Sequence, residues 1–174
     1  MKKTLIFLLG VMMMVACGPN REQRVKDIEE HELQLSTIDI SSDDSEAVEM
    51  LSMYRQFASD FSDDSLAPVY MMRAADLSIN IGQTEQAVAL LDSVIELYPG
   101  FEDVAGCMFL RGYAYECAEM YDQAKEAYTQ FVETYPDHYL AQDTRKMLQY
   151  IGMSPEEMFE AVMNSATDAN LTME

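Results

Sequence analysis

Apolar side chains recur along residues 45–135 with the spacing of helices that each bury one face. Counting back from Phe61, Tyr98 and Tyr135, an apolar residue returns after four, three and four positions in every case. Side chains at these intervals lie on one face of an α-helix. The pattern therefore predicts amphipathic helices that end at these three aromatic residues.

The same pattern repeats at a constant interval of 37 residues. Aromatic-proline pairs at 98–99 and 135–136 end two of the helices, because proline lacks an N–H and disfavours helix in the residue before it. Gly82 separates two further helices, as expected of a glycine after a helix C-terminus. The predicted helices are 45–61, 68–81, 84–98, 105–118 and 121–135. The expected fold class is all-α, built from helix-turn-helix units.

Two of these units resemble the tetratricopeptide repeat, which places small, large, small, aromatic and proline residues at set positions. Counted from residue 105, those positions hold Gly112, Tyr115, Ala124, Tyr128 and Pro136. Counted from residue 68, they hold Ala75, Ser78, Ala87, Leu91 and Pro99, of which three fit well. The resemblance implies a solenoid of about three repeats, the first of them degenerate because Ser62 replaces its proline. A generic helical bundle is the alternative.

The two ends are less regular. Residues 21–34 are expected to form a charged helix, 36–42 a loop, and 138–151 a truncated first helix of a further repeat. Ser154 and Glu157 have the spacing of a capping box and should start a last helix. Phe159, Val162 and Met163 would give this helix one apolar face with which to cap the solenoid. The predicted divisions are 1–16 signal peptide, 17–43 tether and helix, 44–163 repeat domain, and 164–174 frayed tail.

The first residues are typical of a secretory signal, with two lysines followed by an apolar run from Leu5 to Ala16. A helix of that length would rise about 18 Å, which is less than the ~30 Å core of a bilayer. Met14-Val15-Ala16-Cys17 resembles the lipobox of bacterial lipoproteins. This resemblance implies acyl chains on Cys17 as the membrane anchor. Gly18 after the cysteine, without an acidic run, favours the periplasmic face of the outer membrane.

Composition narrows the chemistry further. The formal net charge of -20 argues against binding to nucleic acid, whose phosphates would repel the chain. Only His31 and His138 are present, and Leu35 stands where a zinc-protease helix that began at His31 would need its second histidine. The Ser-Asp-Asp-Ser stretches at 42–45 and 62–65 lack the glycine of a calcium loop. We therefore expect no catalytic residues, no metal and no cofactor.

In repeats of this family the first helices line a concave groove that binds segments of partner proteins. Asp76 and Glu116 would favour a basic residue on the bound segment. Alternatively, these side chains pack against 138–151 or against the N-terminal helix. The candidate groove residues are Val69, Met72, Asp76, Ile79, Asn80, Phe109, Tyr113 and Glu116.

Most of the chain is similar to small tetratricopeptide lipoproteins of the Bacteroidetes type. It is more distantly similar to the repeat lipoprotein of the β-barrel assembly machine and to the repeat domain of the Tol–Pal coordinator. The resemblance implies a non-enzymatic envelope adaptor that serves outer-membrane biogenesis or maintenance. A self-associating structural subunit is the alternative. An enzyme or small-ligand receptor is a remoter one, because it would need converging polar groups in a deep pocket.

Overall fold

The computed structural model describes the backbone of residues 20–36 and 44–171, and the side chains of residues 20–36 and 45–163. Cys17, the signal segment and most of the expected 36–42 loop lie outside the described residues. Eight helices and no strand occur in the described part, so the all-α prediction is confirmed. The helices are α1 (Arg21–Leu35), α2 (Asp44–Asp60), α3 (Leu66–Asn80), α4 (Thr84–Leu97), α5 (Val104–Cys117), α6 (Tyr121–Thr134), α7 (Ala141–Met147) and α8 (Pro155–Leu171).

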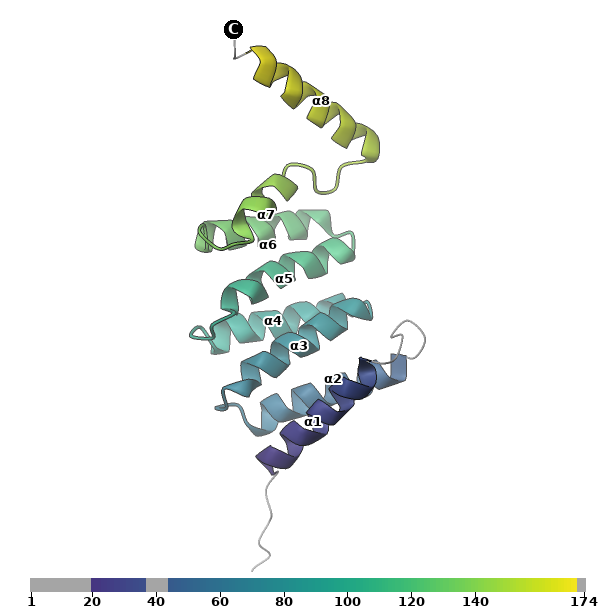
Figure 1. Ribbon diagram of the computed structural model, residues 1–174, viewed down its shortest axis with the longest axis vertical. Coiled ribbons are helices and arrows are strands. Elements are labelled where there is room, and N and C mark those ends of the chain that lie inside the picture. Colours follow the sequence, from purple (N-terminus) through teal and green to yellow (C-terminus); the bar gives the residue numbers. More distant parts are fainter. Residues whose placement is uncertain (1–19, 37–43, 172–174) are drawn as a thin grey trace, which may run out of the picture.

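Successive helices from α1 to α7 pack against one another and form an elongated stack (Figure 1). The hairpin α3–α4 turns at Gly82, which has a φ of 74°, a conformation that glycine adopts without a steric penalty. The next hairpin, α5–α6, places Glu119 at the matching position with a φ of 58°. Both hairpins thus use the same left-handed turn, although only the first has the glycine that predicts it.

The backbones of α5 and α6 approach closely where the sequence places its smallest residue. A Cβ on Gly112 would lie 2.5 Å from Cδ1 of Tyr128, whose side chain is fully buried. Ala75, Ala87 and Ala124 are fully buried at the corresponding small positions of the two repeats. Small residues on one helix therefore make room for large side chains of its neighbour, as the repeat pattern predicts.

The N-terminal helix belongs to this stack. Ile28 of α1 is buried in one core cluster with Met50 and Phe57 of α2. An ion pair between Arg21 and Asp64 ties the first turn of α1 to the segment that precedes α3. The division expected between 17–43 and 44–163 therefore does not separate α1 from the repeats in packing.

The C-terminal end differs from the expectation of a capping helix. The end of the stack is covered by α7 and the residues after it, where Ala141, Thr144 and Ile151 are buried. Gly152, with a φ of 77°, then turns the chain, and α8 leads away from the stack (Figure 1). Phe159, expected to pack in the cap, is 67% exposed.

The start of α8 follows the prediction from the sequence. Ser154 and Glu157 form the predicted capping box, with Glu157 Oε2 accepting from the Ser154 N–H at 2.8 Å. Helix α8 continues to Leu171, past the boundary at 163 that was expected for the repeat domain. Over the described residues, no helix is long and apolar enough to cross a membrane.

Candidate protein-binding groove

A groove of about 830 Å³ runs along the first helices of consecutive hairpins. Helices α1, α3 and α5 all contribute to its lining, because each is the first helix of its hairpin and α3 contacts α5 directly. Residues 101–103 and 139–140, which precede α5 and α7, complete the lining. We call this feature the concave groove.

Five of the eight candidate residues line the concave groove. They share the face of α3 and α5 that points away from the second helices of the hairpins. The five are Val69, Met72, Asp76, Asn80 and Phe109.

Ile79 does not line the concave groove, contrary to expectation. Its side chain is only 8% exposed and packs with Ala87 of α4 and Ala114 of α5. The reason is its position on α3, where it faces the neighbouring hairpin instead of the groove-facing row that contains Asp76 and Asn80.

Tyr113 and Glu116 lie on α5 beyond the lining of the concave groove. A hydrogen bond with Cys117 raises the pKa of the exposed Tyr113 phenol. Glu116 accepts a hydrogen bond of 2.7 Å from the Tyr128 hydroxyl. Burial, followed by this bond to a carboxylate, raises the pKa of Tyr128. Glu116 thus serves an internal contact instead of facing a guest.

One end of the concave groove holds a hydrogen-bonded cluster that the sequence did not reveal. Glu32 of α1 accepts from the Tyr54 hydroxyl at 2.7 Å and forms an ion pair with Arg73. The Arg73 guanidinium also lies 5.7 Å from the centre of the Tyr70 ring, within cation–π range. Burial and the Glu32 carboxylate raise the pKa of Tyr54. Arg73, the groove's cation, is therefore already neutralised by Glu32.

The remaining charges in the lining are carboxylates. Within the described residues, Asp76, Glu102 and Asp103 form no ion pair. Burial raises the pKa of the Asp76 carboxyl, as expected for an anion held against apolar neighbours. The neighbouring lining is apolar and includes Met72 and Phe109. The concave groove thus combines apolar surface with uncompensated negative charge.

The lining suits binding better than reaction. Neither histidine nor cysteine lines the concave groove, and no group of side chains in the described part of the chain is placed to hold a metal ion. The His31 Nδ1–H donates a hydrogen bond of 3.0 Å to the Asp27 carbonyl, and His138 packs edge-on against Phe131. Both histidines are therefore used in local structure.

Two segments in the central part of the chain match a known protein family. Residues 70–100 and 107–138 each match the family model of the tetratricopeptide repeat. No curated protein and no solved structure matches the chain. The two matched segments coincide with the α3–α4 and α5–α6 hairpins, whose first helices line the concave groove. These two segments in the central part of the chain are therefore similar to tetratricopeptide repeats, a class of repeat that generally binds protein partners.

Proposed function

We propose that the protein is a non-catalytic adaptor of the bacterial envelope that binds a segment of another envelope protein in the concave groove. The observation that carries the proposal is the groove itself, where consecutive repeats present an apolar surface edged with carboxylates that form no ion pair in the described part of the chain. Its volume alone would also suit a small ligand. Its lining, however, extends from α1 to residues 139–140, which fits an elongated guest better than a compact one.

The side chains of the groove are well suited to peptide recognition. Met72 is flexible and polarizable, so it adapts to varied apolar partners. Phe109 is half-buried and packs against Tyr128 and Phe131, which fixes its ring as a rigid contact surface. Aromatic anchors of this kind supply much of the binding energy in protein interfaces.

The envelope location is supported by the lipobox-like sequence that ends at Cys17. Acyl chains on this cysteine would tether the stack to a membrane, and more than one chain is needed for a stable anchor. Gly18 supports retention at the periplasmic face of the outer membrane. A role in outer-membrane biogenesis or maintenance follows from the resemblance to envelope repeat lipoproteins.

In-cell photocrosslinking tests the groove. A photoreactive amino acid at Met72 should give one adduct that mass spectrometry identifies as an envelope protein. The same amino acid at Glu133 of α6, outside the lining, is the matched control. The Asp76→Arg change should weaken the Met72 adduct if the guest is basic where it meets the groove. No adduct at Met72, or equal adducts at Met72 and Glu133, would overturn the role of the groove.

The anchor needs a separate experiment. Cys17→Ser should abolish incorporation of a labelled fatty acid. Incorporation of the label into this variant would contradict acylation of Cys17. Neither result depends on what occupies the concave groove.

A second candidate function is self-association as a structural subunit. Met158 and Phe159 on α8 are exposed, which leaves apolar surface near the end of the stack. Sedimentation of the Cys17→Ser protein should then show a concentration-dependent dimer that Phe159→Glu removes. A monomer at all concentrations would eliminate this candidate.

A further inference from the structure

A second hollow, of about 800 Å³, lies beside the concave groove at the edge of the stack. It is lined by residues 62–66, which lead into α3, and by residues 97–102, which connect α4 to α5. We call it the loop-edge hollow. Val69, Phe101 and Glu102 line both this hollow and the concave groove, so the two are continuous.

The loop-edge hollow has the same chemical character as the groove. Leu97 is 68% exposed there and lies beside the apolar surfaces of Pro68 and Phe101. Among the described residues Asp63 and Glu102 form no ion pair, whereas Asp64 is paired with Arg21. The hollow therefore adds exposed apolar area and one further carboxylate, Asp63, that forms no ion pair within the described part of the chain.

The two loops of this hollow are held together. The Tyr98 hydroxyl donates a hydrogen bond of 2.9 Å to the carbonyl of Ser62. Burial and, secondarily, the Asp63 carboxylate raise the pKa of Tyr98, so this phenol stays a neutral donor. The bond joins the segment before α3 to the segment after α4 and keeps the hollow formed without a ligand.

We propose that the concave groove and the loop-edge hollow form one track for an extended segment of a partner protein. This inference rests on the proposed function. In that segment, basic residues alternate with large apolar ones. Asp76 marks the groove end of the track, Glu102 the junction, and Asp63 the loop-edge end. Lysine or arginine of the guest meets these carboxylates while its apolar side chains cover Met72 and Leu97.

Charge complementarity selects this guest over the chain's own C-terminal helix. Helix α8 has apolar side chains of suitable size, but its sequence contains Glu156, Glu157 and Glu160 and no lysine or arginine. Insertion of α8 from a second copy would bring these acids against Asp76 and Glu102, and unpaired like charges at an interface are unfavourable. A basic segment gains attraction at the same positions.

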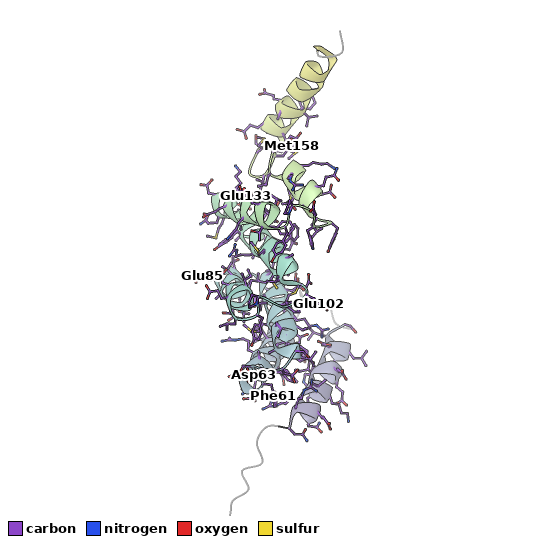
Figure 2. All side chains as sticks on the ribbon, turned by 90° about the vertical axis from the view of Figure 1, so that its left-hand side faces the viewer. Phe61, Asp63, Glu85, Glu102, Glu133 and Met158 are labelled. Atoms are coloured by element: carbon purple, nitrogen blue, oxygen red, sulfur yellow. The ribbon has the colours of Figure 1, made fainter. Side chains whose placement is uncertain are left out.

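Peptide binding to the full-length Cys17→Ser protein tests the track. The probe is a labelled synthetic peptide in which lysine alternates with leucine and phenylalanine, and its match has glutamate in place of lysine. Asp76→Asn tests the groove end and Asp63→Asn the loop-edge end. Glu133→Gln removes one carboxylate on the opposite side of the ribbon from Glu102 (Figure 2). Fluorescence anisotropy gives Kd, and circular dichroism verifies that each variant is folded.

We expect the lysine peptide to bind and the glutamate peptide not to bind. Asp76→Asn and Asp63→Asn should each raise Kd by about threefold to fivefold, as for exposed charge pairs. Their effects should multiply in the double variant if one peptide spans both sites. Glu133→Gln should leave Kd unchanged.

Each of the other outcomes would contradict a defined part of this inference. If only Asp76→Asn weakened peptide binding, the continuous track would be refuted, whereas the proposed adaptor function of the concave groove would not be affected. Equal weakening by Glu133→Gln would show attraction to net charge only, and equal binding of the glutamate peptide would refute the basic guest. Failure of both peptides to bind would refute this inference, whereas crosslinking from Met72 in cells decides the proposed function independently.

Discussion

Replacing Gly112 with alanine probes the closest helix approach in the two repeats. The added Cβ would lie 2.5, 2.6 and 2.8 Å from three ring carbons of Tyr128. The ring is poorly placed to move, because it is fully buried, packs against Phe109 and is held by its hydrogen bond to Glu116. Helices α5 and α6 must therefore separate or the ring must leave its preferred rotamer.

Two opposing effects set the expected change in the free energy of unfolding. Overpacking a core by one methyl group costs about 1–3 kcal/mol. Alanine is favoured over glycine within a helix by about 1 kcal/mol. Because three contacts fall below van der Waals distance, we take the upper end of the first term and expect a net loss of about 2 kcal/mol. In a protein of this size that corresponds to a Tm lower by about 4–8 °C.

Urea unfolding followed by circular dichroism measures the loss. Gly100→Ala is the matched control, since a Cβ there meets no atom within 4 Å, and its effect should stay within about 0.5 kcal/mol. In a Tyr128→Ala background the clash is absent, so Gly112→Ala should become stabilising by about 1 kcal/mol. Unchanged or greater stability of the single Gly112→Ala variant would refute the close-packing explanation.

Four further outcomes are expected. Removal of α8 should change the free energy of unfolding by no more than about 0.5 kcal/mol, because Met158, Phe159, Val162 and Met163 are exposed. A larger loss in urea unfolding would show that α8 caps the stack. Glu119→Gly should stabilise the protein by about 1 kcal/mol and so raise Tm, because glycine adopts the left-handed backbone conformation without steric strain. A lower Tm would contradict this reasoning. Arg21 lowers the pKa of Asp64, so their pair contributes stability above the ordinary carboxyl pKa of 3.8 and loses it as pH falls through the lower folded value. The stability difference between the wild type and Arg21→Ala should therefore shrink in acid, as measured by urea unfolding across pH. Iodoacetamide should label the exposed Cys117 in the folded protein and Cys107 only after unfolding, because burial raises the pKa of the Cys107 thiol to about 12; mass spectrometry of the labelled peptides distinguishes the two.

The positions of the central helices were predictable because helical periodicity is local. The expected 45–61, 84–98 and 121–135 differ from α2, α4 and α6 by one residue at their ends. The short α7 was less predictable, since a helix was expected over 138–151 and only Ala141–Met147 is α-helical. Its limits depend on how Met147, Leu148 and Ile151 pack with Ala124 and Tyr128 of α6, a contact that no local pattern encodes.

The concave groove was predictable in part for a related reason. Repeat geometry fixes which face of α3 and α5 is concave, and this identified Met72 and Phe109 among others. The sequence did not predict Glu32 and Arg73 as groove residues, because their ion pair depends on how α1 packs in the stack. It also misassigned Ile79, whose environment is set by the next hairpin.

By itself, the sequence determined the helical class, the 37-residue repeat and the positions of its small and aromatic residues, such as Gly112 and Tyr128. All of these follow from the spacing of side chains along one helix or between adjacent helices. Only the tertiary structure decided that α1 joins the stack, that α8 departs from it, and that the groove continues into the loop-edge hollow. The physical reason is that an apolar face specifies that it is to be buried, whereas its partner depends on turn geometry and on contacts between distant segments.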